Sequence, residues 1–221
     1  MFYHKKILFF LFSIISVGFI TFTSQENEWI LKKQSNEVTV YSRGVDRSAI
    51  KELRAVTQIK TSLSSIIALL LDRESYPQWV YKCAKSHVLK EVNDAEAICY
   101  QNVVAPWPIN NRDIILIVTV QQDEATKIVF LNSVSQPEYI PKVDNHVRVL
   151  EFKASWKLTP LQNGIVNCEY QLLFDPGGNV PTWIVNAAAI DGPFETTSNM
   201  RRMVLKEKYQ KMHYAFIKEL Q

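Results

Sequence analysis

The sequence predicts an α+β fold in which a run of antiparallel strands is followed by a C-terminal helical region. The chain has 221 residues, of which 47% are hydrophobic and 21% charged, as is typical of a globular domain. Short alternating or apolar segments separated by turn residues dominate residues 37–174 and indicate strands. Helical patterns occupy a short segment near residue 65 and the region after residue 182. Strands that follow one another in this way favour antiparallel pairing.

The region 37–92 predicts three strands and one helix. Alternating residues indicate strands over 37–43 and 52–60, and a further strand is expected over 85–92. Residues 61–62, Thr-Ser, are good helix caps, and the apolar run Leu63–Leu71 predicts a short helix after them. A helix without a polar face is expected to be buried.

The middle of the chain predicts consecutive hairpins. Strands are expected over 96–104, 113–122 and 127–135, with polar turn residues between them. A loop with two prolines then leads to a last hairpin, formed by 147–159 and 165–174. No linker or internal repeat divides this region, so we expect one domain.

The C-terminal region predicts a long helix with one interruption. The glycines and proline of 175–178 end the last strand, and the pattern of 182–190 is helical. Residues 191–193, Asp-Gly-Pro, interrupt the helix because proline removes a backbone hydrogen bond. We expect the helix to resume over 193–220, with a charged and mostly solvated face from 201 to 218.

Residues 106–113, Pro-Trp-Pro-Ile-Asn-Asn-Arg-Asp, form the most informative stretch of the sequence. Its prolines cannot donate hydrogen bonds to a sheet, so they end the preceding strand. Arg112 and Asp113 then place two charges at the start of a very apolar strand, where charges are costly unless they are paired or solvated. Neighbours on a strand point to opposite faces, so Arg112 shares one face with Leu116 and Val118, and Asp113 lies on the other. The pattern leaves open which of the two faces points inward.

Three segments resemble START domains, the steroidogenic acute regulatory protein-related lipid-transfer family. Residues 106–113 resemble the family's P-W-P-x-x-N-R-D turn, and residues 178–186 are similar to the family's entry into its last helix. Residues 76–79, Tyr-Pro-Gln-Trp, resemble the segment after its second helix. The resemblance covers about residues 28–218. It implies a helix-grip fold, in which a curved antiparallel sheet wraps around a long C-terminal helix and encloses an apolar cavity.

The resemblance also implies a function and a set of site residues. START domains hold a lipid or other apolar small molecule, with polar groups deep in the cavity, and Arg112 matches the arginine of the motif. The expected ligand-binding residues are Arg112, Asp113, Trp107, Leu116, Val118, Trp183, Ile184, Ala187 and Ala188. No catalytic residue is expected. The alternatives are a helix-grip enzyme, cyclase-like or hydrolase-like, that acts on an apolar substrate in the same cavity, and a sealed structural or partner-binding domain with a filled core.

The remaining composition argues against other classes of protein. His87, His146 and His213 are too far apart in sequence to suggest a metal site, and no nucleotide-binding or hydrolase motif occurs, so no metal and no cofactor are expected. The net charge of +3 is too small to indicate nucleic-acid binding. The expected partners are a lipid or apolar small molecule and, transiently, a membrane, and the expected state is a monomer.

Cys83, Cys99 and Cys168 are odd in number, which leaves at least one free thiol. Cys99 and Cys168 lie in apolar strand segments and are expected to be core residues. A disulfide is compatible with an exported protein, but the sequence assigns none.

The N-terminus has the pattern of a targeting segment. Lys5 and Lys6 precede an uncharged, largely apolar run over 7–25. This predicts either a signal peptide over 1–24 with a weak cleavage site or an uncleaved N-terminal anchor. Residues 25–221 would then form the START-like lipid-binding domain. The expected location is periplasmic, cell-surface or secreted, or inner-membrane anchored if the segment is retained.

Overall fold

A computed structural model describes residues 28–46, 48–178 and 180–220, and the predicted targeting segment lies outside these residues. In the described part, ten strands form one curved sheet in the order β1-β2-β3-β10-β9-β7-β6-β5-β4, and β8 pairs with β6. The pairs along this path are antiparallel, whereas β6 and β8 are parallel. The strands are β1 (Ile30–Ser35), β2 (Val38–Val45), β3 (Ser48–Lys60), β4 (Cys83–Asn93), β5 (Glu96–Val103), β6 (Asn111–Gln122), β7 (Val129–Ser135), β8 (His146–Arg148), β9 (Glu151–Leu161) and β10 (Ile165–Asp175).

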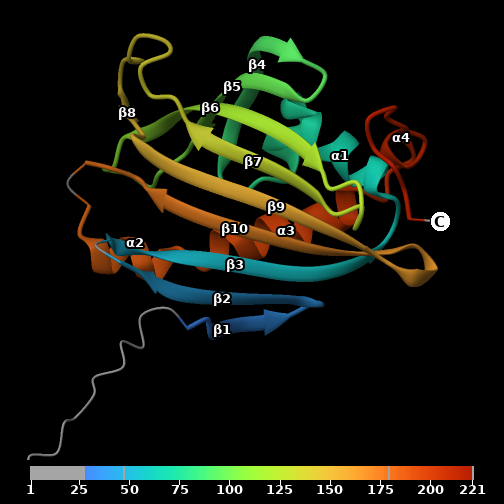
Figure 1. Ribbon diagram of the computed structural model, residues 1–221. Helices are drawn as coiled ribbons and strands as arrows, with labels where there is room; N and C mark the ends of the chain where they lie inside the picture. Colours follow the sequence, from blue (N-terminus) through green and yellow to red (C-terminus); the bar gives the residue numbers. More distant parts are fainter. Residues whose placement is uncertain (1–27, 47, 179, 221) are drawn as a thin grey trace, which may run out of the picture.

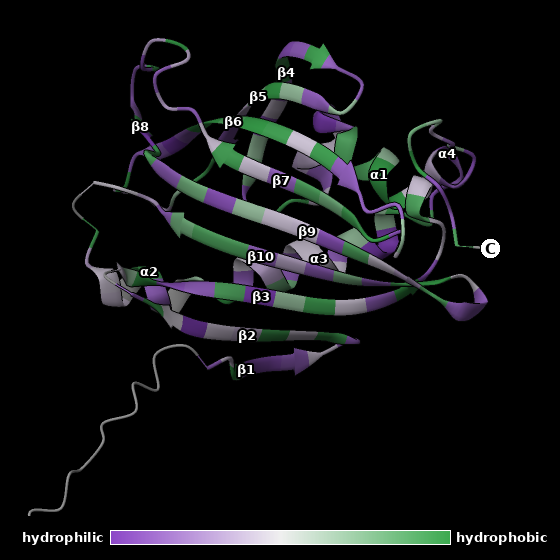
Figure 2. Ribbon diagram, in the orientation of Figure 1, coloured by the Kyte–Doolittle hydropathy of each residue, from purple (hydrophilic) through white to green (hydrophobic). Residues whose placement is uncertain are grey.

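Apart from the short η3 (Gln162–Gly164), which forms the turn between β9 and β10, the helices gather on one side of the sheet (Figure 1). They are α1 (Leu63–Leu71), η2 (Arg73–Gln78), α2 (Thr182–Ala188), α3 (Asp191–Met203) and α4 (Glu207–Gln210). Helix α3 runs behind β3 and β10, while α2 lies at one end of the sheet and α1 and α4 at the other (Figure 1). Apolar and polar residues alternate along most strands, so one face of the sheet supplies the core (Figure 2). The predicted α+β class and curved antiparallel sheet are confirmed.

Helix α1 forms where the sequence predicts it and is buried in the core at one end of the sheet. Ser62 caps its first turn by accepting a hydrogen bond from the backbone N–H of Ser65 at 3.1 Å. Residues 63–70 are all buried. A helix that is apolar all round is stable only when it is surrounded by other elements, and α1 shares one buried cluster with strands of the sheet and with the C-terminal region, where α4 contacts it.

Two strand predictions need correction. Strand β1 was not predicted, and its side chains are mostly exposed at the edge of the sheet, which explains the weak pattern. The segment 147–159 is not one strand but two. The short strand β8 pairs in parallel with the start of β6, and β9 begins at Glu151 to pair with β7 and β10.

The prediction of a helix over 193–220 is wrong beyond Met203. The predicted interruption is present, because α2 ends at Ala188 and α3 begins at Asp191. After α3, only the short helix α4 follows, and residues 211–220 contain no further helix. The chain instead folds back across the end of the sheet and contacts α1.

Residues 204–220, called the C-terminal strap below, are held by buried and polar contacts. Tyr209 and Ile217 are buried, which contradicts the prediction of a mostly solvated segment. The Glu219 carboxylate accepts hydrogen bonds from the N–H groups of Leu63 and Ser64, both at 2.9 Å, at the N-terminus of α1. The Gln122 side chain bonds both backbone groups of Lys218. A carboxylate at a helix N-terminus accepts hydrogen bonds from N–H groups that are otherwise unpaired, and its negative charge interacts favourably with the helix dipole.

In the described part of the chain, no helix is both long and apolar enough to cross a bilayer.

Candidate functional site

A cavity of about 300 Å³ lies between the inner face of the sheet and the helices. Residues from β3, β5, β6, β7, β9 and β10 line one wall, and residues from η2, the segment 79–82, α2 and α3 line the other. The lining is mostly apolar and aromatic. Such a concave, apolar space is the usual form of a small-molecule site.

The cavity is graded from a buried end to an open end. Trp79, Leu131 and Trp156 line it and are no more than 5% exposed. At the other end the lining includes the exposed residues Val104 and Lys51. The open end therefore lies where the turn 104–109, the start of β3 and α2 meet, and this end is called the mouth below.

Aromatic pairs build the walls of the buried end. The rings of Trp156 and Tyr170, which are opposite each other in the β9–β10 register, stack at 4.4 Å. The rings of Tyr76 and Trp79 meet edge to face at 5.0 Å. Large rings on paired strands give a rigid apolar surface at small entropic cost. Trp156 and Tyr170 lie in the two strands of the predicted last hairpin, on the same face. This spacing is present in the sequence, but the prediction did not use it.

Arg73 is, with Arg112, one of two charged residues of the lining that are buried in the described part of the chain, and sequence reasoning missed it. Its side chain is 5% exposed, and its Nη1 donates to the hydroxyl of Tyr76. That hydroxyl in turn donates to the carbonyl of Leu70 at 2.7 Å. The Nη2 of Arg73 is buried without a hydrogen-bond partner in the described structure. In sequence, Arg73 stands beside Glu74 after a helix, a setting typical of surface charges, so no local signal marks it.

Arg112 lines the cavity on the same face as Ile114 and Leu116. It is 4% exposed and donates to the backbone carbonyls of Asn110, Pro176 and Gly177 at 2.5–3.2 Å. These bonds tie the proline-rich turn to the segment that leads into α2. Arg112 therefore fixes the geometry of the mouth, and its donors are occupied by the chain itself.

Asp113 points to the opposite face and forms a buried ion pair with Arg148. Arg148 Nη2 and Nε lie 2.7 Å and 2.9 Å from Asp113 Oδ2, and both side chains are at most 2% exposed. Arg148 also donates to the carbonyls of Pro137, Ile140 and Pro141. The pair thus fastens the loop before β8 to the start of β6. Arg148 was missed, although an arginine between Val147 and Val149 in an apolar segment is a usable signal.

The other predicted ligand-binding residues lie in different environments. Leu116 lines the cavity, whereas Val118 is buried in the adjoining core. Trp107 and Trp183 are 93% and 73% exposed and do not line the cavity. The side chains of three predicted residues lie outside the described part of the structure: Ile184, Ala187 and Ala188.

Helix α2 borders the mouth and is attached to the sheet by one amide. Val185 and Ala189 contribute to the lining. Asn186 Oδ1 accepts from the N–H of Lys51 at 3.1 Å, and its Nδ2 donates to the carbonyl of Ala49 at 3.0 Å. This pair of bonds holds α2 against the start of β3.

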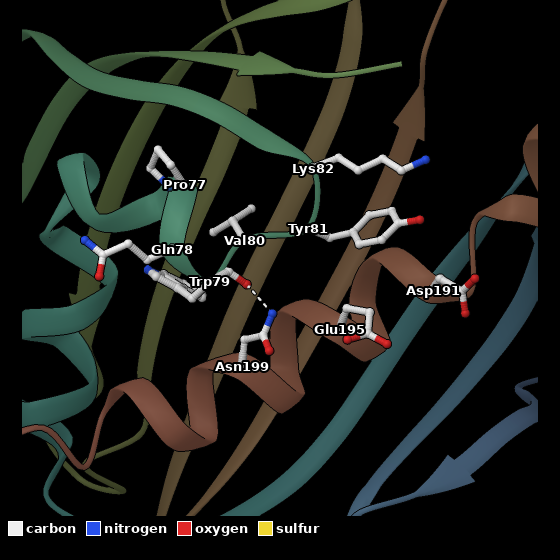
Figure 3. A pocket seen from close by; sticks show the side chains of 9 residues that line it. All are labelled: Pro77, Gln78, Trp79, Val80, Tyr81, Lys82, Asp191, Glu195 and Asn199. Carbon is white, nitrogen blue, oxygen red and sulfur yellow. Dashed lines mark hydrogen bonds between the residues drawn. The ribbon is translucent and has the colours of Figure 1, made fainter. Parts of the chain in front are cut away.

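A second, shallower pocket lies outside the cavity, between the segment 77–82 and α3 (Figure 3). Figure 3 shows Tyr81 and Lys82 on one side and Glu195 and Asn199 on the helix. The Asn199 amide donates to the carbonyl of Trp79 at 3.1 Å, and Thr196 Oγ1 accepts from the N–H of Tyr81 at 3.1 Å. These bonds fix the segment that carries Trp79 against α3.

The described residues include no cluster of His, Cys, Asp or Glu suited to a metal ion. All three cysteines are free and buried. Burial raises the pKa of the Cys83 thiol to about 11 and that of the Cys168 thiol to about 12. These two thiols are therefore protonated at neutral pH and behave as small core side chains.

Comparison with known proteins identifies the family. A START domain family model matches residues 19–209. An uncharacterised protein of Pseudomonas aeruginosa is 33% identical over 174 residues, which cover 79% of this chain and 85% of the relative. The phosphatidylcholine transfer protein of Rattus norvegicus is 24% identical over 75% of this chain and 78% of its own length. The crystal structure of a STAR-related lipid transfer protein from Xanthomonas axonopodis aligns with a TM-score of 0.74 and 30% identity, over 80% of this chain and 98% of that one.

The curved antiparallel sheet and its C-terminal helices define a helix-grip protein. With the family match over most of its length, the chain belongs to the START domain family.

Proposed function

We propose that this protein binds a lipid or another apolar small molecule in the cavity and releases it unchanged at a membrane. The observation that carries the proposal is the graded cavity, with a buried aromatic end and an exposed mouth. The names of its relatives, a phosphatidylcholine transfer protein and a STAR-related lipid transfer protein, support the same class of ligand.

Burial of an apolar chain supplies the affinity. Each buried CH₂ is worth about 0.8 kcal/mol, so about 15 methylenes give about 12 kcal/mol before the entropic cost of binding. A ligand held this tightly leaves slowly unless the mouth opens. Helix α2 is the proposed cover, because its residue Val185 and the adjoining Ala189 line the cavity and Asn186 attaches the helix to β3.

Contact with a membrane is proposed to occur at the mouth. Trp107 and Trp183 are highly exposed on two segments whose neighbouring residues, such as Ile109 and Val185, line the cavity. Exposed tryptophans favour the interface between water and lipid. Replacing both with alanine should weaken sedimentation with neutral vesicles while leaving ligand binding in solution intact.

The lining favours binding over catalysis. Among the described lining residues there is no carboxylate, imidazole or thiol that could act as a general base or nucleophile. An enzyme that acts on an apolar substrate in this cavity is the alternative, and it predicts that an extracted ligand is converted on incubation with fresh protein.

Export is proposed from the sequence pattern alone, with Lys5 and Lys6 before an apolar run. The full chain expressed in a bacterium with its leader should appear outside the cytoplasm with a new N-terminus near Gln25, or in the membrane fraction if the segment is retained. Recovery of a soluble cytoplasmic protein that retains Met1 would refute this part of the proposal.

The ligand-binding proposal is tested by filling the cavity. Ala154 on β9 lines the cavity, whereas its neighbour Ser155 points to the opposite face. We expect Ala154→Phe to weaken binding of a fluorescent acyl probe at least tenfold with little loss of stability, because the ring occupies empty space. Ser155→Phe adds the same side chain to the same strand and should leave binding unchanged.

Native mass spectrometry of the purified protein complements this test by detecting a copurified lipid. A filled core would instead show no probe binding in the unaltered protein, and Ala154→Phe would then cause overpacking strain of about 1–3 kcal/mol.

A further inference from the structure

Arg73 places a positive charge at the buried end of the cavity that no other side chain of the described structure neutralises. It is 5% exposed, and its Nη2 has no hydrogen-bond partner there. None of the ion pairs among the described residues involves it. An arginine side chain cannot lose its proton in a protein, so the charge is permanent.

The groups that touch Arg73 stay neutral. Burial raises the pKa of Tyr76 to about 12, although the nearby Arg73 charge acts in the opposite direction. Burial also raises the pKa of the Cys99 thiol, again against the effect of Arg73. Both groups therefore keep their protons at pH 7 and cannot serve as counterions.

The other cations of the lining differ from Arg73 in exposure or in partners. Lys51 and Lys82 are exposed to water at their edges of the cavity. Arg112 is buried, but its donors bond three backbone carbonyls. Arg73 is thus the buried cation with a donor left over, and a buried charge is costly unless it is paired. The fork of a guanidinium matches carboxylate and phosphate groups.

We propose that the cavity takes an amphiphile with an anionic head, a carboxylate or a phosphate, which accepts a hydrogen bond from Nη2 of Arg73. The head enters first and lies beside Tyr76 and Trp79, and the apolar chain extends toward the mouth. A cavity of about 300 Å³ is at the small end of ligand sites, so a single-chain amphiphile is the expected class. This inference rests on the proposed function and assigns the head group within it.

The test compares ligands that share one chain and differ in the head. Hexadecanoate, hexadecyl phosphate, hexadecanol and inorganic phosphate compete at pH 8 against a neutral fluorescent acyl probe. We expect the two anionic amphiphiles to bind at least tenfold more tightly than the alcohol. Inorganic phosphate should not compete. Displacement by inorganic phosphate at the same concentration would overturn the proposal in favour of a site for free anions.

Two variants assign the preference to Arg73. In Arg73→Met, the affinities for the anionic amphiphiles and for the alcohol should be within about twofold of each other, because the variant has lost the preference for an anionic head. Lys82→Met, which removes an exposed lysine of the lining, should keep the tenfold preference. Replacing a buried unpaired charge with an apolar side chain of similar length is neutral or stabilising, so the ligand-free Tm of Arg73→Met should not fall. Arg73→Lys, which keeps the charge and loses the fork, should retain part of the preference.

The outcomes separate the head-group assignment from the proposed function. Equal binding of acid, phosphate and alcohol by the unaltered protein overturns the assignment of Arg73, whatever the variants do, and leaves lipid binding in place. A preference that persists in Arg73→Met also overturns it. Failure of the acyl probe and of every amphiphile to bind refutes the proposed function itself.

Discussion

Helix α2 and the C-terminal strap flank α3 in the chain, yet they are held to the rest of the molecule in opposite ways. The strap buries Tyr209 and Ile217 and caps α1 through Glu219. None of the described side chains of α2 is buried, and its side-chain bonds to β3 run through Asn186 alone. They lie at opposite ends of the sheet (Figure 1).

The difference shows where the fold can open. Regions with few buried apolar contacts and exposed hydrogen bonds have the lowest local stability. The strap closes the end of the core next to α1, and α2 borders the mouth of the cavity. We therefore infer that ligand entry uses α2 and that the strap stays in place.

The largest expected effect on stability concerns the Asp113–Arg148 ion pair, and it tests whether the opening at the mouth is confined to α2. The Asp113–Arg148 pair lies near the mouth but is fully buried. We expect Arg148→Ala to destabilise the protein by about 3–5 kcal/mol, because Asp113 is left buried without its partner. Chemical denaturation measures the loss.

The double variant Asp113→Leu, Arg148→Met is the control for the ion pair. Replacing both charges with apolar side chains should recover most of the loss. If the single variant is as stable as the unaltered protein, the mouth is mobile beyond α2 and the contrast between the two ends fails.

The second effect tests the strap. Tyr209 is 2% exposed, and its hydroxyl donates to Asp72 Oδ2 at 2.8 Å. Tyr209→Ala should cost about 3 kcal/mol through the cavity it leaves. Tyr209→Phe keeps the ring and should cost only about 1 kcal/mol, the net value of one hydrogen bond. Equal effects of the two variants would contradict a packing role for the ring.

The third effect is a dependence of stability on pH through Asp72, which bonds the strap. Burial raises the pKa of Asp72, but hydrogen bonds from Lys208 and Tyr209 outweigh it and bring the pKa below its ordinary value of 3.8. A carboxyl whose folded-state pKa is lowered stabilises the fold above its unfolded-state pKa. That stability is lost as the pH falls through the folded-state value. The expected window is therefore below about pH 4.

A comparison of melting curves checks this window. Between pH 5 and pH 3, the Tm of the unaltered protein should fall more than that of Asp72→Asn, which has no charge to lose. Parallel curves for the two proteins would show that Asp72 does not link the strap to acid stability.

Much of the fold could be predicted because local pattern determines it. Helix α1 and the strands from β2 to β7 follow from apolar spacing and from the turn residues between them. The strap could not be predicted, because its course depends on contacts such as Glu219 with the start of α1, which are distant in sequence. Its polar residues have helical propensity, but buried tertiary contacts outweigh a propensity of a few tenths of a kcal/mol per residue.

The candidate site was predictable only in outline. The run of residues 106–113 marked two unusual charges, yet their partners could not be inferred. Asp113 pairs with Arg148, and Arg112 bonds carbonyls of the segment before α2. Arg73 has no distinctive sequence pattern, because its burial results from η2 turning its side chain toward the sheet. In a strand, the alternation of residues tells which face of the sheet each side chain is on, whereas a short 3₁₀ segment has no repeat from which this can be inferred.

The smallest expected effect on stability is the sharpest test of the opening at α2. Asn186 is half-buried and bonds the backbone of Ala49 and Lys51 at the edge of β3. In Asn186→Ala those backbone groups can turn to water, so the Tm should change by little, equivalent to less than about 1 kcal/mol. Local opening should become easier, because the bonds that join α2 to the sheet are gone. We expect faster amide hydrogen exchange in α2 and faster ligand release, with exchange in α1 and the strap unchanged.

Asn199→Ala, which removes a similar amide bond between α3 and Trp79, is the matched control and should leave exchange in α2 unchanged. A rise in exchange along the whole C-terminal region of Asn186→Ala would mean that α2 and the strap open together, and the mouth would then not be a separate gate.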